Sequence, residues 1–452
     1  MKRKFISMLL AAALGVTLLA GCGGNDKKEQ ETNPPVEQGD DTQEPEKQEE
    51  PPAETGDKEV LEFYHGYYHD ESEWPAAKVM RDLYDEFAAQ HADGPVEFKP
   101  IPVENRDDIV STEVAGGSFP DMVDCGVAIP LAAISQNLVY DMKPFIDENG
   151  LQAAVGVNYT QNDVDGKIYS VHDQLESRGM WYNSKILEAA GVKPEDLNTW
   201  DGFAKAMEKV RALGDGSYGY AAGQGSFIML NAYLASTEEG RAMMAADLTA
   251  ESIESEAFAK AFKTIAKLDQ DNGSDHTVDD LGLVMDDFNK AGTMAVLPNG
   301  VWNAGGIDAA LADVIEPMIF PENVSLSSAG AGLTIANNMS EAKTELALEF
   351  VRYMTSKEVA EKIFTGVQAN PCNTEVDLNA LAEASGDVVT MKLAKACTMV
   401  NEAGTISESV AYTWGQDIRM AIQNALKECA VAGADIDARF DQLKQELTAI
   451  IG

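Results

Sequence analysis

The sequence predicts an α/β protein with two domains. From about residue 60 to the C-terminus, short β-like runs alternate with amphipathic helical segments, and this alternation is typical of α/β architecture with parallel sheets. The region holds about 390 residues, more than one hydrophobic core usually organises. No internal repeat is visible, so the chain is not expected to be a repeat array.

The expected elements follow from residue spacing and from turn chemistry. In the segment 75–90, Pro75 suits a first helical turn, and Val79, Leu83 and Phe87 recur on one face. The expected strands are 60–64, 96–101 and 121–123, and the expected helices are 75–90, 108–115, 200–213, 255–271, 341–355 and 418–429.

The N-terminus has the pattern of a lipoprotein signal peptide. Basic residues at 2–4 precede an apolar run at 5–20, which is shorter than the roughly 20 residues that cross a bilayer. Small residues then lead to Cys22. We expect residues 1–21 to be removed and Cys22 to carry two acyl chains, which stable anchoring requires. The alternative is an ordinary signal peptide followed by an incidental cysteine.

Residues 22–59 are predicted to form a disordered acidic tether. They are rich in Glu, Gln, Asp and Pro and nearly lack large apolar side chains, so burial cannot offset chain entropy. The whole chain has a formal net charge of −41 and no basic block, which argues against nucleic-acid binding. The mature protein is expected at the extracytoplasmic face of the cell membrane.

Motifs for metal, nucleotide or catalytic chemistry are weak. The sequence has no HExxH, GxSxG or Walker pattern, so we expect no metal, no cofactor and no enzyme activity. Residues 214–219 match GxGxxG, but they follow a helix and precede a strand-like run, the reverse of a dinucleotide site; they predict a helix stop and turn. Residues 269–275 imperfectly match a calcium loop and are interpreted as a solvated loop.

Four cysteines remain besides Cys22. An oxidising compartment permits disulfides between them, but their wide spacing and apolar neighbours fit buried free thiols better. They are Cys125, Cys372, Cys397 and Cys429.

Several motifs, in their order along the chain, resemble the family 1 extracellular solute-binding proteins of ABC importers, the group that includes maltose-binding protein. The resemblance runs from about residue 60 to the C-terminus. In one departure, His172 stands where the family usually has proline. The motifs are Gly117–Asp121, the short stretch Gln136–Met142, the hairpin Asp165–Val171, the strand Met180–Asn183, the helix end Leu187–Val192, Thr199–Trp200, Phe288–Val296, Asn299–Asn303, Gly332–Ile335, the helix 341–355 and Ala411–Trp414.

The resemblance implies a two-lobe periplasmic-binding-protein fold of type II, with a hinge and an inter-domain ligand cleft. The N-lobe is expected at roughly 60–168 plus part of 300–370. The C-lobe is expected at roughly 169–300 plus the C-terminal helices. The implied function is capture of a mono- or oligosaccharide and delivery to the permease subunits of an ABC importer, by a monomer.

Aromatic and acidic residues are the implied sugar contacts. Sugar C–H faces stack on aromatic rings, and sugar hydroxyls bond to planar polar side chains; core packing is the alternative for each aromatic residue. Cys125 and Ala128 fall where maltose-binding protein has an aromatic residue and an acid. The expected contacts are Tyr67, Tyr68, Trp74, Glu176, Trp302 and Trp414.

Three other interpretations stay open at this point. The same fold could bind a peptide, a polyamine or an anion, although Arg178 is the only arginine near the strongest motif block. The chain could be a surface enzyme acting on polysaccharide, or a structural or adhesive lipoprotein whose cleft holds no ligand.

Overall fold

The computed structural model describes residues 58–126, 129–220, 224–272, 281–410 and 413–452. The expected signal peptide, Cys22 and all but the end of the expected tether lie outside these ranges. Lys58 is the first described residue, and the first strand already begins at Glu59.

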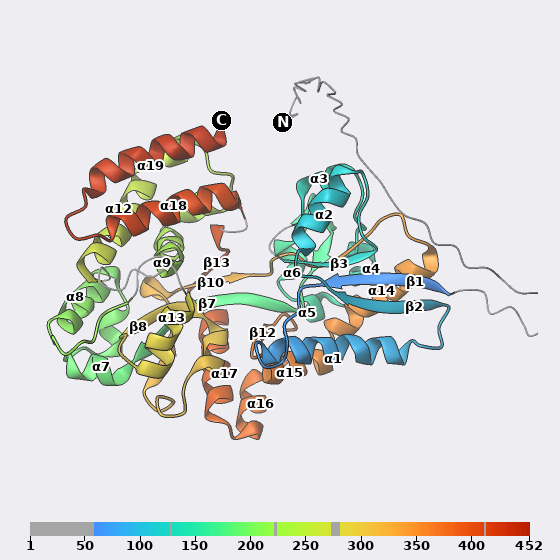
Figure 1. The fold of residues 1–452 in the computed structure, drawn as a ribbon, viewed down its shortest axis with the longest axis horizontal. Coiled ribbons are helices and arrows are strands. Elements are labelled where there is room, and N and C mark those ends of the chain that lie inside the picture. The colour runs from blue at the N-terminus through green and yellow to red at the C-terminus, as the bar shows by residue number, and fades with distance from the viewer. Residues whose placement is uncertain (1–57, 127–128, 221–223, 273–280, 411–412) are drawn as a thin grey trace, which may run out of the picture. The chain divides into compact units, whose positions relative to one another are not determined.

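A five-stranded sheet organises the first lobe (Figure 1), in the order β2-β1-β3-β11-β6. Strand β1 runs parallel to β2 and to β3, whereas β11 runs antiparallel to β3 and β6. The carboxyl ends of β1 and β3 therefore meet at one edge. The strands are β1 (Glu59–His65), β2 (Val96–Pro102), β3 (Met122–Cys125), β6 (Ser170–Val171) and β11 (Gly332–Ile335).

Helices cover this sheet by burying their apolar faces. Helix α1 starts and ends at the expected residues, with Pro75 in its first turn. Its buried Phe87 lies 4.9 Å from Phe98 of β2 and 4.9 Å from Phe350 of α14, ring centre to ring centre. The helices of the first lobe are α1 (Pro75–Gln90), α2 (Arg106–Ala115), α3 (Leu131–Ser135), α4 (Lys143–Glu148), α5 (Gln152–Val155), α6 (Asn158–Gln161), α14 (Glu341–Met354), α15 (Lys357–Lys362) and η6 (Ile363–Val367).

The expected hairpin in the motif block forms as predicted. Strands β4 (Asp163–Val164) and β5 (Lys167–Ile168) pair antiparallel, and the turn residues Asp165 and Gly166 both have positive φ. This left-handed geometry fits the twist of a two-residue hairpin.

A second sheet is built around the long strand β7. The prediction of parallel sheets is wrong here, because β8, β9, β10 and β12 all run antiparallel to β7 and only the pair β10–β13 is parallel. The direction in which the chain returns to β7 depends on how the intervening helices pack, which local patterns do not encode. The strands are β7 (Gln174–Asn183), β8 (Val296–Gly300), β9 (Ile315–Met318), β10 (Val324–Ser328), β12 (Asn370–Pro371) and β13 (Thr405–Ser407).

The second lobe carries most of the remaining helices. Thr199 accepts from the Gly202 N–H and caps α8, and Trp200 packs in the core. The helices are α7 (Ser184–Ala189), η1 (Pro194–Leu197), α8 (Trp200–Arg211), α9 (Gln224–Ala235), α10 (Glu238–Met244), α11 (Ala250–Ile253), α12 (Glu256–Asn272), α13 (Leu281–Asp286), η3 (Asp287–Ala291), η4 (Val301–Gly306), η5 (Pro321–Asn323), α16 (Leu378–Ser385), α17 (Val388–Asn401), α18 (Gly415–Cys429) and α19 (Ile436–Ile451).

The two weak motifs both lie in this lobe. Gly214 and Gly216 have positive φ just after α8, which confirms a helix stop and turn. The interpretation of 269–275 as a solvated loop is wrong for its first four residues, because α12 continues to Asn272 and Asp269 is fully buried; the rest of that segment lies outside the described ranges. None of the described helices has the length and apolar character that crossing a bilayer needs.

Three segments of the chain meet where the two sheets adjoin. Leu175, Ala329 and Cys372 form a small apolar cluster separate from the cores of the lobes. His172 lies at this point: its backbone N–H donates to Asn158 at 2.9 Å, a bond that proline could not make. The departure from the family pattern therefore provides a hydrogen bond at the crossing.

The cysteines are unpaired, as the sequence predicted. All four are free and buried. Burial raises the pKa of the Cys125 thiol to about 12 and that of the Cys429 thiol to about 11, which keeps both protonated.

Candidate functional site

An aromatic loop follows strand β1 at the edge of the first sheet. Ring centres lie 5.1 Å apart for Tyr67 and Trp74, 4.2 Å for Tyr68 and His69, and 5.9 Å for His69 and Trp74. Tyr67 is buried, whereas Tyr68 and Trp74 expose 40% and 41% of their surface. Arg81 on α1 donates to the carbonyl oxygens of Tyr67 and His69 at 2.8 and 2.7 Å. The hydrogen bonds from Arg81 therefore fix the backbone of a loop that carries two half-exposed rings, those of Tyr68 and Trp74.

An ion pair lies at the same edge of the sheet. Arg106, which begins α2, donates from Nη1 to Oδ2 of Asp124 on β3 at 2.8 Å. A Cβ on Gly66 would lie 2.2 Å from that nitrogen, so glycine leaves room for the guanidinium. Neighbouring His65 is buried, and desolvation lowers its pKa to about 4. Its ring is therefore neutral near pH 7.

Strand β7 carries a row of partly exposed polar side chains. Gln174, Glu176 and Arg178 alternate with buried neighbours, so they project from one face over roughly 13 Å of strand. At the start of the row, Gln174 Nε2 donates to the hydroxyl oxygen of Tyr67 at 2.8 Å. Further along, Arg178 Nη2 donates to both carboxylate oxygens of Glu176 at 3.0 Å. We call Gln174, Glu176 and Arg178 the β7 row.

The β7 row ends at Trp302. The Cζ atom of Arg178 lies 4.9 Å from the centre of the Trp302 ring, a cation–π geometry. Gly300 is the β8 partner of Arg178, and a Cβ there would come within 2.2 Å of the Trp302 ring. The Trp302 ring therefore packs against the backbone of Gly300 and against the guanidinium group of Arg178.

Comparison with known proteins identifies the family. The sequence profile of the family described as bacterial extracellular solute-binding protein matches residues 82–390, more than half of the chain. The chain belongs to this family.

One solved structure is similar over almost the whole folded region. It is a Streptococcus pneumoniae solute-binding protein in complex with the blood group A-trisaccharide, 46% identical, with a TM-score of 0.78 over 86% of this chain and 100% of that one. A chitin oligosaccharide binding protein, 17% identical, has a TM-score of 0.67 over 86% of this chain and 98% of that one. At that identity it supports the two-lobe fold alone.

Curated relatives match over shorter stretches. The arabinooligosaccharide-binding protein of Bacillus subtilis is 28% identical over 118 residues, which is 24% of this chain and 25% of the relative. The lactose-binding protein of Rhizobium radiobacter is 26% identical over 145 residues, which is 30% of this chain and 33% of the relative. The chain thus spans a quarter to a third of these relatives.

The structure of this solute-binding protein brings most of the expected contact residues together. Tyr67, Glu176 and Trp302 lie along the β7 row, and Tyr68 and Trp74 lie in the aromatic loop beside Tyr67. The arrangement therefore joins residues from both sheets through one strand.

Trp414 lies elsewhere. It is 3% exposed, its indole nitrogen donates to the Ala246 carbonyl oxygen at 3.1 Å, and its ring centre lies 6.2 Å from that of Phe258. These contacts belong to the core of the second lobe. Contact between Trp414 and a ligand stays a prediction, and the burial of Trp414 argues against it.

Sequence reasoning missed several polar members of the site. Gln174 and the Arg106–Asp124 pair were not singled out, and Arg178 was noted only as a nearby cation. The alternation of polar and apolar residues from Gln174 onward could have indicated the β7 row. Asp124 immediately precedes Cys125, the residue at the position where maltose-binding protein has an aromatic residue; Ala128, at the position of the acid, lies outside the described residues.

The arrangement combines rings with planar hydrogen-bonding groups. A half-exposed ring offers an apolar face, while carboxylate, amide and guanidinium groups offer donors and acceptors in one plane. These are the groups that a polyhydroxylated ring requires. Within the described ranges, no three His, Cys, Asp or Glu side chains are placed to share a metal ion.

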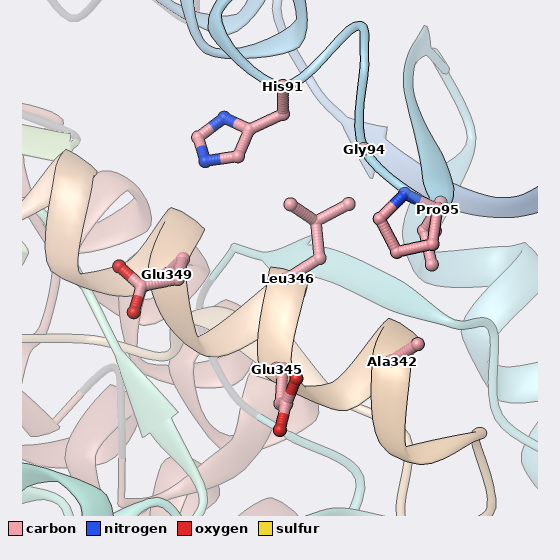
Figure 2. A pocket seen from close by; sticks show the side chains of 8 residues that line it. His91, Gly94, Pro95, Ala342, Glu345, Leu346 and Glu349 are labelled. Atoms are coloured by element: carbon pink, nitrogen blue, oxygen red, sulfur yellow. The ribbon is translucent and has the colours of Figure 1, made fainter.

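A separate hollow of about 180 Å³ lies in the first lobe between α14 and the turn after α1 (Figure 2). His91 and Leu346 reach toward it, and Glu345 and Glu349 lie along α14 at its side. None of the expected contact residues lines it, so it is distinct from the β7 row.

Proposed function

We propose that this protein is the substrate-binding component of an ABC importer, that it captures a carbohydrate between its lobes, and that it delivers the sugar to membrane permease subunits. The observation that carries this proposal is the 46% identity over the full length of a solute-binding protein solved with a bound trisaccharide. Family members bind solutes rather than convert them, and the family description indicates an extracytoplasmic location.

The position of the β7 row suggests how sugar binding would favour closure of the lobes. Tyr67 and Trp74 follow β1 of the first sheet, and Glu176 and Trp302 lie on β7 and η4, beside the second sheet. A sugar that contacts both ends binds better when the lobes close on it, and this difference in affinity shifts the population toward the closed form.

Anchoring through Cys22 is part of the proposal. The basic, apolar and small residues at 2–22 supply a lipoprotein signal, and two acyl chains would hold the mature protein at the membrane as a monomer. The acidic segment that follows would let the folded part reach its permease.

Calorimetric titration with a panel of neutral mono- and oligosaccharides tests the proposal. The blood group A-trisaccharide belongs in the panel because of the 46% identical relative. We expect at least one sugar to bind, and we expect Trp302→Ala to weaken that binding by more than about 1 kcal/mol, since a stacking face is lost.

Trp302→Phe is the matched control, because it keeps an aromatic face at the same backbone position. It should retain most of the affinity, and both variants should unfold at temperatures close to that of the native protein. Unchanged affinity in Trp302→Ala would remove Trp302 from the site. Absence of binding to every sugar in the panel would contradict the carbohydrate proposal itself.

A further inference from the structure

We propose that Glu176 and Arg178 act together as a charge filter that makes the site select neutral over anionic sugars. The inference deepens the proposed function and rests on it. The ion pair lies in the middle of the β7 row, and the cation lies directly over the ring that is proposed to stack the sugar.

The geometry of Arg178 leaves its charge neutralised. One terminal nitrogen lies 3.0 Å from each carboxylate oxygen of Glu176, and the guanidinium packs on Trp302. The Arg178 side chain is 16% exposed, against 40% for Glu176. A ligand that reaches Trp302 therefore meets a cation that already has its counter-ion, and the more open member of the pair is the carboxylate.

Two arginines at the edge of the first sheet, Arg81 and Arg106, are also engaged. Nη1 of Arg106 lies 2.8 Å from Oδ2 of Asp124, and Nε of Arg106 lies 3.7 Å from Oδ1 of Asp107. Arg81 uses Nη1 for the carbonyl oxygens of Tyr67 and His69. A carboxylate-bearing sugar would have to compete with Asp124 to obtain a salt bridge with Arg106.

One buried acid just before β7 adds negative charge near the β7 row. Asp173 precedes the β7 row and is 4% exposed. Its Oδ1 lies 4.0 Å from Nε2 of His172. Over the whole chain the formal net charge is −41, and a surplus of this size disfavours approach of an anion at long range. The pairing of Arg178 with Glu176 and the negative net charge of the chain therefore both disfavour anionic sugars.

The hydroxyl groups of a neutral sugar can form hydrogen bonds with Glu176 and Arg178. A carboxylate can accept hydrogen bonds from sugar hydroxyls, and the remaining guanidinium N–H groups of Arg178 can donate to a hydroxyl oxygen. A neutral sugar can use both without separating the pair, whereas a uronate places its carboxylate beside that of Glu176, and like charges at that range are unfavourable.

A matched ligand pair tests the filter. The probes are the blood group A-trisaccharide and the same trisaccharide with one hydroxymethyl group oxidised to a carboxylate; if the panel reveals a tighter neutral oligosaccharide, the pair is built on that sugar. The native protein should bind the neutral probe at least about tenfold tighter than the acid. In Glu176→Gln, Arg178 loses its counter-ion, and the ratio should fall at least about threefold, with acid binding that weakens as salt is added.

Two further variants separate this mechanism from a general loss of charge. Glu349→Gln removes a carboxylate from a similar pair, with Arg352 at 3.1 Å on α14, and should leave the ratio unchanged. The double variant Glu176→Gln/Arg178→Gln should give a ratio between those of the native protein and Glu176→Gln, because the unpaired cation is gone but the repulsion from the Glu176 carboxylate is gone as well. Equal or tighter binding of the acid by the native protein, or an unchanged ratio in Glu176→Gln, would overturn the filter while leaving sugar binding intact. If no neutral sugar binds at all, the proposed function fails and the filter with it.

Discussion

Asp269 shows how one buried carboxyl can couple this fold to pH. It lies at the end of α12, fully buried, and accepts a hydrogen bond from the Tyr220 hydroxyl at 2.6 Å. Burial raises its pKa from 3.8 to about 7. The folded state therefore holds this proton more tightly than the unfolded chain does. Stability falls as pH rises from about 4 to about 7 and stays lower above that, by at most about 4 kcal/mol.

Asp269→Asn should remove this pH dependence. The amide oxygen can still accept from Tyr220, and no charge is buried at high pH. We expect the variant to match the native protein near pH 4.5 and to exceed its free energy of unfolding by about 1–3 kcal/mol at pH 8. Urea denaturation at both pH values measures the difference.

Asp215→Asn is the control for this experiment. Asp215 is exposed, and hydrogen bonds from Ser217 lower its pKa, so it is ionised throughout that range. The control should show no gain at pH 8. A constant difference between Asp269→Asn and the native protein at both pH values would contradict the assignment of the proton to Asp269.

At the scale of elements, capped and strongly periodic helices could be predicted almost to the residue. Helix α1 was predicted at 75–90 because Pro75 and the apolar spacing mark its start and face, and α8 because Thr199 caps it. The direction of the strands around β7 could not be predicted, since it follows from helix packing between distant segments.

The candidate site was predictable in part for the same reason. Tyr67 and Trp74 follow a predicted strand, and their ring centres lie 5.1 Å apart in the structure. Trp302 lies two residues after Gly300, which leaves room for its ring. Contact of these residues with ligand stays a prediction. Trp414 had an equally suggestive neighbourhood in the sequence, but its ring packs on Phe258. Whether an aromatic residue faces ligand or core depends on contacts made by residues far away in the chain.

Gly332 is the element-scale position with a sharp steric prediction. Its φ is +80°, and a Cβ there would lie 2.5 Å from Cα of His172 on the neighbouring crossing segment. Gly332→Ala should therefore lower the free energy of unfolding by about 2–4 kcal/mol, through backbone strain plus a backbone clash. Chemical denaturation measures the loss.

Gly386→Ala separates these two causes. Gly386 also has a positive φ, of +65°, but nothing lies within 4 Å of its added Cβ. This control should lose only about 1–2 kcal/mol. If the two substitutions cost the same, the contact between Gly332 and His172 contributes nothing to stability.

At the scale of the whole molecule, the proposed anchor and the folded region should act independently. Cys22→Ser removes the thiol that is proposed to carry lipid and leaves every residue of the β7 row unchanged. We expect the variant to appear in the medium or periplasm with unchanged affinity for sugar, because two acyl chains are what hold the protein at the membrane. Cell fractionation followed by calorimetry checks both parts.

Substitution of Ser7 by Ala is a suitable control, since it retains the apolar run and Cys22. It should leave the protein in the membrane fraction. If Cys22→Ser also stayed with the membrane, lipid on Cys22 would not be the anchor, and the binding proposal would be unaffected.

The four buried thiols make this protein convenient for fluorescence labelling. Each is shielded from reagents in the folded state, and the raised pKa values of Cys125 and Cys429 keep the reactive thiolate scarce. In the Cys22→Ser background, maleimide dyes would therefore attach to one cysteine introduced on each lobe and leave the native ones unmodified. Energy transfer between the two dyes would then report the distance between the lobes, molecule by molecule, while sugar is added.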